Sequence, residues 1–147
     1  MKKIIMILAA VSLIALLACQ DYSNDKPIDY KRLPSAVQAF VDSNYSDVDV
    51  LYATKDDDLI LPDYTVMLKN GVKLQFGNSG ELESIKVREG AVPAGVVPAM
   101  IADYVRSAYP EAFIKEYELD RNSYEVKLSN RLEIKFNRNF QVVEIDD

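Results

Sequence analysis

Residues 64–76 read Tyr-Thr-Val-Met-Leu-Lys-Asn-Gly-Val-Lys-Leu-Gln-Phe, and sixty positions later residues 124–136 read Tyr-Glu-Val-Lys-Leu-Ser-Asn-Arg-Leu-Glu-Ile-Lys-Phe. In both stretches apolar side chains alternate with polar ones on each side of a central Asn-Gly or Asn-Arg pair. Alternation with a period of two is typical of a strand with one buried face, and Asn-Gly is a strong signal for a two-residue turn. Each stretch therefore predicts a β-hairpin. The turn is poorer in the second copy because Arg131 disfavours positive φ.

The similarity between the two hairpins extends along most of the chain. Residues 33–56 match residues 97–120 at a separation of 64, with Pro34 on Pro98. The separation falls to 60 at the hairpins because the first copy carries four extra residues between positions 57 and 63. Apolar class and order are kept over some fifty positions, which predicts a duplicated structural unit.

Each copy is predicted to begin with a helix. A proline is tolerated in the first helical turn, where its missing N–H would have no partner, and apolar side chains then recur at helical spacing. The helices should end near Tyr45 and near Tyr109, where Pro110 prevents continuation. The apolar positions are Val37, Phe40 and Val41 in the first copy and Ile101, Tyr104, Val105 and Ala108 in the second.

About four strands are predicted to follow each helix. They are 48–55, 64–69, 72–76 and 82–87 in the first copy and 113–119, 124–128, 132–136 and 142–145 in the second. A unit of roughly 50–60 residues is marginal alone, so the two copies should pack together or share a sheet. The sequence thus predicts an α+β fold, a tandem repeat of one helix plus about four antiparallel strands, with the helices packed on one face of the sheet. The repeats are assigned to residues 33–88 and 97–147, and the connector to residues 89–96.

The alternation also predicts a second, polar face of the sheet. An antiparallel sheet commonly packs one face on the core and leaves the other to water or a polar partner. Tyr64, Tyr124, Phe76 and Phe136 are interpreted as core residues rather than a stacking platform, because they are in phase with the apolar positions. The residues expected on the polar face are Thr65, Lys69, Lys73, Gln75, Glu125, Lys127, Glu133 and Lys135.

The first 18 residues are typical of an export signal, since Lys2 and Lys3 precede an apolar run that is short for a membrane span. The run ends in Leu-Leu-Ala-Cys, which resembles the lipobox of bacterial lipoproteins, with Leu16, Leu17 and Ala18 as its recognition positions. The resemblance implies removal of residues 1–18 and attachment of lipid to Cys19. A plain secretory peptide or a retained anchor helix are the alternatives.

Residues 19–32 are polar and are predicted to form a flexible tether between the lipid and the folded part. Gln20 stands where an Asp retains such lipoproteins in the inner membrane of some Gram-negative bacteria. The resemblance therefore favours an anchor in the outer membrane, on its periplasmic or surface face.

The composition excludes several kinds of chemistry. The chain has no His and a single Cys, so His-based acid–base catalysis, Ser-His-Asp and Cys-His nucleophiles, and ordinary zinc sites cannot be assembled from it. Without the leader it carries 15 basic and 23 acidic side chains, a net of −8. Because phosphate contacts need a basic face, nucleic acid is an improbable partner. We expect no cofactor and no catalytic or metal residues.

The order of these motifs resembles a known family. The series consists of a leading Leu-Pro or Val-Pro, a helix ending in Asn-Tyr or Ala-Tyr-Pro, Tyr-x-Val-x-Leu, Asn-Gly, Leu-x-Phe and a closing Asn-x-x-Gly turn. It is similar to that of the PepSY-like lipoproteins described as beta-lactamase-inhibitor-like. The resemblance covers Leu33 to the C-terminus. It implies tandem helix-plus-sheet modules that form one antiparallel sheet, with a binding or inhibitory role in the cell envelope. It transfers no site residues.

The four extra residues of the first copy suggest a contact site. Leu59, Ile60, Leu61 and Pro62 place three large aliphatic side chains in a loop that the second copy lacks, so they are not needed to close the shared core. The alternative is that the strands run longer here and these residues pack.

An acidic run precedes this loop. Asp56, Asp57, Asp58 and Asp63 could attract a cation. They lack the spacing and the glycine of a calcium loop, however, and are more typical of a solvated hairpin tip.

Together these features predict a non-enzymatic binding module of the cell envelope, tethered through Cys19, that recognises a protein or peptide through the open sheet face or the Leu59–Pro62 loop. The alternatives are an inhibitor of an envelope hydrolase, a structural accessory lipoprotein, and a carboxylate-based hydrolase.

The lipid anchor is directly testable. Cys19→Ala should leave the leader uncut or release the protein from membranes, because several acyl chains contribute roughly 0.8 kcal/mol per buried methylene. Fractionation and mass spectrometry of the intact protein measure both outcomes. Unchanged mass and membrane attachment in the variant would contradict lipidation.

Overall fold

The computed structural model describes residues 25–57 and 60–147; the predicted leader and Cys19 lie outside them. Its helical segments are η1 (Tyr30–Arg32), α1 (Ser35–Asn44) and α2 (Ala99–Ala108). Its strands are β1 (Asp25–Pro27), β2 (Val50–Asp56), β3 (Asp63–Leu68), β4 (Lys73–Phe76), β5 (Leu82–Lys86), β6 (Ile114–Leu119), β7 (Ser123–Leu128), β8 (Glu133–Asn137) and β9 (Val142–Asp146).

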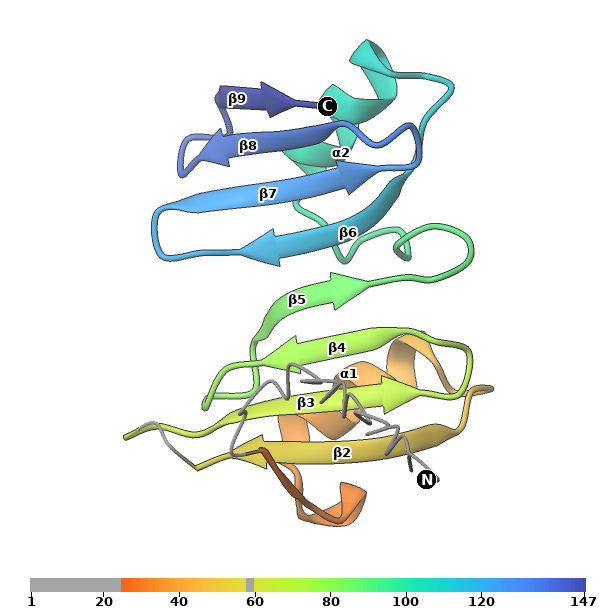
Figure 1. The fold of residues 1–147 in the computed structure, drawn as a ribbon, viewed down its shortest axis with the longest axis vertical. Coiled ribbons are helices and arrows are strands. Elements are labelled where there is room, and N and C mark those ends of the chain that lie inside the picture. The colour runs from red at the N-terminus through yellow and green to blue at the C-terminus, as the bar shows by residue number, and fades with distance from the viewer. Residues whose placement is uncertain (1–24, 58–59) are drawn as a thin grey trace, which may run out of the picture.

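All these strands form one antiparallel sheet in which each strand lies beside the next along the chain, from β1 to β9 (Figure 1). β2–β5 belong to the first repeat and β6–β9 to the second. β5 and β6 pair through Ile85 opposite Tyr117, with Lys86 opposite Glu116 on one side. The predicted α+β class and tandem repeat are therefore confirmed, and the two copies share a single sheet.

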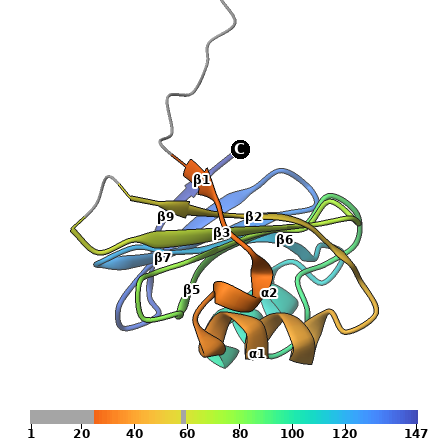
Figure 2. The same cartoon turned by 90° about the horizontal axis from the view of Figure 1, so that it is seen from below.

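The two helices make equivalent contacts with the sheet. Phe40 of α1 meets Phe76 edge-on at 5.5 Å between ring centroids, and Tyr104 of α2 meets Phe136 edge-on at the same distance. Phe76 and Phe136 are fully buried, as the repeat predicts. Figure 2 shows both helices on the same side of the sheet.

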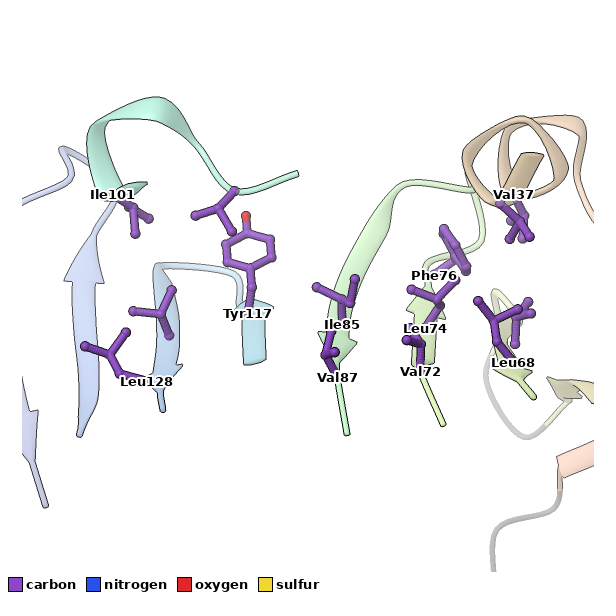
Figure 3. Packing of buried hydrophobic residues seen from close by; sticks show 14 of the residues in the cluster. Val37, Leu68, Val72, Leu74, Phe76, Ile85, Val87, Ile101, Tyr117 and Leu128 are labelled. Carbon is purple, nitrogen blue, oxygen red and sulfur yellow. The ribbon is translucent and has the colours of Figure 1, made fainter. Parts of the chain in front are cut away.

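One continuous core lies between the helices and the sheet. It includes alternate residues of both hairpins, such as Val66 and Leu74 in the first repeat and Val126 and Ile134 in the second. Figure 3 shows how the side chains of the two repeats line up along this layer, with Tyr117 next to the first repeat's Ile85.

The segment predicted as a flexible tether is in part folded. Asp25–Pro27 pairs with β2 as β1, and the Ile28 N–H donates to the Ala53 carbonyl at 3.0 Å. Asp29 then caps η1 by accepting from the Lys31 N–H. The sequence could not predict this strand, because three polar residues have no strand pattern of their own and are held by an edge far along the chain.

Neither α1 nor α2, the α-helices found in residues 25–57 and 60–147, is long and apolar enough to cross a membrane.

The hairpin turn of the second repeat adopts a backbone conformation that is costly for its residue. Arg131 has φ 76°, while its counterpart Gly71 has φ 84°. A left-handed conformation costs a non-glycine residue roughly 1–2 kcal/mol. A glycine avoids this cost, but it loses more conformational entropy on folding, so only part of the roughly 1–2 kcal/mol is gained.

Arg131→Gly should therefore raise the free energy of unfolding by roughly 0.5–1 kcal/mol. Urea denaturation of the two proteins measures this change. Arg131→Ala is the matched control, because it removes the side chain and keeps the unfavourable φ. An equal gain in both variants would show that the side chain, not the backbone, causes the effect.

Candidate functional site

The sheet face opposite the helices is the candidate site, and we call it the open face. Strand register places its residues in two rows, which alternate with the buried residues and so project away from the core. The first row is Thr54, Thr65, Gln75, Ser84, Glu118, Glu125, Lys135 and Glu144. The second row is Tyr52, Met67, Lys73, Lys86, Glu116, Lys127, Glu133 and Asp146.

The two halves of the open face differ in charge. In the first repeat, the first row is neutral and the second contains Lys73 and Lys86. In the second repeat, both rows together contain six carboxylates and two lysines. The face therefore changes from neutral or basic to acidic where the repeats meet.

Two ion pairs lie on the open face. Lys86 and Glu116 join β5 to β6 at 3.1 Å, and Lys127 pairs with Glu133 between β7 and β8. All four side chains keep more than a third of their surface exposed, so water screens them and each pair contributes at most about 1 kcal/mol. The pairs hold the side chains in place more than they stabilise the fold.

The open face is slightly hollowed where the repeats meet. One depression of about 130 Å³ is lined by Ser84, Lys86, Glu116, Tyr117, Glu118, Glu125, Lys127 and Glu133. A second, of about 160 Å³, is lined by Asp63, Tyr64, Thr65, Gln75, Glu83, Ser84, Glu118 and Leu119. Ser84 and Glu118, which face each other across the junction, contribute to both. Polar groups dominate both hollows, which suits hydrogen-bonding and charged ligand groups.

Several carboxyl groups on or beside this face lie close to one another. Burial raises the pKa of Glu125, and the nearby Glu118 and Glu133 raise it further. Burial likewise raises the pKa of Glu83, with a smaller contribution from Asp63. These groups would favour a ligand that brings positive charge or hydrogen-bond donors, because either stabilises the charged carboxylates that burial and their acidic neighbours disfavour.

The predicted polar face is largely correct but incomplete. Lys69 lies beyond the end of β3 and pairs with Asp49 at 2.8 Å. The junction residues Ser84, Glu116 and Glu118 are absent from the sequence-based prediction. They alternate with buried residues in their strands, which is a usable signal, but their importance depends on the β5–β6 pairing.

The loop proposed as a contact site exposes its described apolar residues. Ile60 is 101% exposed and Leu61 59% exposed, while Pro62 is half-buried. Leu59 lies outside the described residues. Ile60 and Leu61 thus lie outside the core, and their contact with a partner stays a prediction.

One of the neighbouring aspartates, Asp57, forms two ion pairs. Asp57 accepts from Lys55 at 2.7 Å and from Lys26 at 3.1 Å, and these contacts lower its pKa, with Lys55 contributing most. Asp58 lies outside the described residues. Over residues 25–57 and 60–147, no group of three or more acidic side chains is arranged to hold a metal ion.

Comparisons with known proteins agree with this architecture. A family model described as "Putative beta-lactamase-inhibitor-like, PepSY-like" matches residues 21–82 and 62–144. A Bacteroides vulgatus periplasmic protein is 39% identical, with a TM-score of 0.82 over 86% of this chain and 99% of its own. A Bacteroides thetaiotaomicron protein, described as a "putative calcium-regulated periplasmic protein", is 37% identical, with a TM-score of 0.80 over 84% and 97%.

A further Bacteroides vulgatus periplasmic protein, of unknown function, is 28% identical, with a TM-score of 0.78 over 84% of this chain and 99% of its own. The comparison with curated proteins gives no match.

The exposure of Ile60 and Leu61 leads to a stability prediction. Ile60→Ser with Leu61→Ser should change the free energy of unfolding by less than about 0.5 kcal/mol, because exposed side chains away from special features contribute little. Leu74→Ala, in the fully buried core, should cost about 2–5 kcal/mol. Chemical denaturation compares the two proteins. A loss of several kcal/mol in the loop variant would mean that these residues pack after all.

The raised pKa of Glu125 predicts a pH-dependent effect. Burial and neighbouring carboxylates disfavour its charged form in the folded state, so its charge destabilises the fold at neutral pH. This penalty is lost as the pH falls through the raised pKa and the group takes up a proton. Glu125→Gln should therefore raise the melting temperature at pH 7 and lose its advantage in acid.

Thermal melts of both proteins between neutral and acid pH test this. Glu111→Gln, in the exposed turn before β6, is the control for removing a negative charge from this acidic chain. The assignment is wrong if Glu125→Gln has the same advantage at every pH.

Proposed function

Because the chain belongs to the PepSY-like, beta-lactamase-inhibitor-like family, we propose that it is a non-enzymatic binding module of the cell envelope that recognises a protein or peptide through its open face. One observation carries the proposal: the two rows of open-face residues run unbroken from β2 to β9, and in Figure 2 neither α1 nor α2 lies on that side of the sheet. A regular surface of this kind suits recognition better than it suits turnover of a small substrate.

The size of the open face fits a protein partner. Nine strands at about 4.8 Å spacing, each roughly five residues long, give a face of about 40 Å by 17 Å, or roughly 650 Å². A specific protein interface buries about 800 Å² on each partner. The open face with the adjoining Ile60–Pro62 loop thus approaches the required area. The shallow hollows are small compared with the about 300–1,000 Å³ of typical small-molecule pockets.

The cellular location also supports this function. The structural neighbours are periplasmic proteins, which supports a place in the envelope or periplasm for this chain. We further propose that lipid on Cys19 anchors it to the outer membrane. β1, the first strand of the described residues, lies at an edge of the sheet and not beneath the middle of the open face.

Inhibition of an envelope hydrolase is the alternative function. The family description favours it, and so does the exposure of Ile60 and Leu61, since an apolar loop that projects into solvent could fill an active-site cleft. A structural accessory role is the remaining possibility, in which the same surfaces would hold another envelope component without changing its activity.

Site-specific photo-cross-linking of the full lipidated chain in living cells tests the proposal. p-Benzoylphenylalanine would replace Thr65 or Lys127 on the open face, or Ile60 in the loop. Control positions are the exposed Ala39 on α1 and Ser107 on α2. We expect a defined protein adduct from the open-face positions and none from the helix controls. Adducts from the helices alone, or none from the open face, would contradict the proposed function.

The identity of the adduct separates the alternatives. If it is a hydrolase, its activity should be measured with and without the purified chain and with the Ile60→Ser, Leu61→Ser variant. Inhibition that this variant loses would assign the inhibitory role, and unchanged activity would assign a binding or accessory role.

A further inference from the structure

The duplication allows the two ends of the repeats to be compared directly. β9 is the second-repeat counterpart of β5: Glu144 corresponds to Ser84, Ile145 to Ile85, and Asp146 to Lys86. β5 is covered along its outer side by β6, whereas β9 is the last strand in the order. Within residues 25–57 and 60–147, β9 has no strand beyond it.

The missing neighbour leaves β9 apolar and exposed. Ile85 is fully buried, because Tyr117 of β6 lies opposite it on the core side. Ile145 occupies the same place in its repeat, opposite the buried Ile134 of β8, yet is 45% exposed. The adjoining Val143 is 58% exposed. A strand beside β9 would cover Ile145 as β6 covers Ile85.

The backbone of β9 is oriented to accept such a strand. The Val87 N–H donates to the Lys115 carbonyl at 2.9 Å, so at β5 the main-chain groups of Val87, and of Ile85 two residues before it, are directed at β6. Their counterparts in the second repeat are Asp147, directly after β9, and Ile145 of β9. In an extended strand the main-chain N–H and carbonyl groups of these two residues are directed at the outer edge of the sheet, where a new antiparallel strand would pair.

The opposite edge of the sheet is protected. β1 lies beside β2, with Pro27 opposite Thr54. Proline has no N–H to donate and blocks further pairing at an edge. β9 contains no proline, so the two edges differ: one is closed by the chain itself and the other is open.

Charge indicates which strand β9 would accept. At the β5–β6 junction Lys86 of the inner strand pairs with Glu116 of the added strand. In β9 the corresponding residue is acidic, Asp146, and Glu144 lies beside it on the same face. Cross-strand pairs are favourable between opposite charges and unfavourable between like charges. An added strand therefore needs basic side chains opposite Glu144 and Asp146.

A second copy of this chain is a poor occupant. Its β9 would bring the same carboxylates to the edge, and its β2 edge is already covered by β1. The occupant is thus a segment of a different protein.

We propose that β9 accepts an extended segment of a partner protein by antiparallel strand addition, with an apolar side chain opposite Ile145 and a basic side chain on each side of it, opposite Glu144 and Asp146. This extends the proposed binding function to a second surface, the sheet edge, and does not require a ligand on the open face.

The chain itself supplies a probe. A fluorescent peptide with the β6 sequence, residues 113–120, carrying Glu116→Lys and Glu118→Lys, would place Tyr117 opposite Ile145 and lysines opposite both acids. Anisotropy with the full lipidated protein in detergent should show saturable binding. The variant with Glu144→Lys and Asp146→Lys should bind this peptide about tenfold more weakly than the unchanged protein does. The same variant should bind the unsubstituted β6 peptide more tightly than the unchanged protein does.

N-methylation separates strand addition from simple charge attraction. In β6 the main-chain groups of Lys115 and Tyr117 are on the side of β5, because the Lys115 carbonyl accepts from Val87. Peptide N-methylated at Tyr117 should lose binding, whereas peptide N-methylated at the neighbouring position 116 should keep it. Charge attraction alone would not distinguish them.

Three outcomes would overturn the proposal: no saturable binding, equal binding by the two methylated peptides, or no effect of the β9 charge reversal.

Sedimentation of the protein alone provides a further test. We expect a monomer, and a dimer that the β9 charge reversal dissociates would make the occupant a second copy and also overturn it. Loss of open-face cross-links with intact peptide binding would instead contradict only the open-face function.

Discussion

The pairing of β5 with β6 is the contact on which the rest of the structure depends. A single repeat of roughly 50–60 residues would bury only a small core and be marginal alone. Ile85 lies opposite Tyr117 in this strand pair. The apolar side chains beneath the two helices therefore form one continuous core. The Lys86–Glu116 ion pair on the opposite face is exposed and contributes little by comparison. The junction is thus held mainly by backbone hydrogen bonds and burial.

Joining two one-sided units side by side also explains the shape of the open face. Each repeat supplies one helix, and both helices lie on the same side (Figure 2). The other side becomes a sheet face twice as wide as either copy could form, with hollows where the copies meet. The two hollows at the junction are therefore lined by residues of both repeats.

The two copies differ at particular positions in the core and at the surface. Tyr45 buries its hydroxyl without a partner because Phe40 stands where the second repeat has Tyr104, whose hydroxyl interacts with Tyr109. That difference lies in the core and has a purely structural effect. Two further differences change the outer surface: Glu144 is exposed where the first repeat has the buried Ser84, and the loop of the first repeat exposes Ile60 and Leu61.

The sequence by itself determined the elements and the core, since strand alternation, helical spacing and the equivalence of Phe76 and Phe136 are local signals that recur in both copies. It also indicated most of the polar face. Only the tertiary structure decided which strands are neighbours: that β1 closes one edge, that β5 and β6 join the repeats, and that β9 is left open. Strand pairing brings together segments far apart in sequence, and a three-residue strand such as β1 has no pattern of its own. The two edges of the sheet are therefore the features that local sequence patterns describe least.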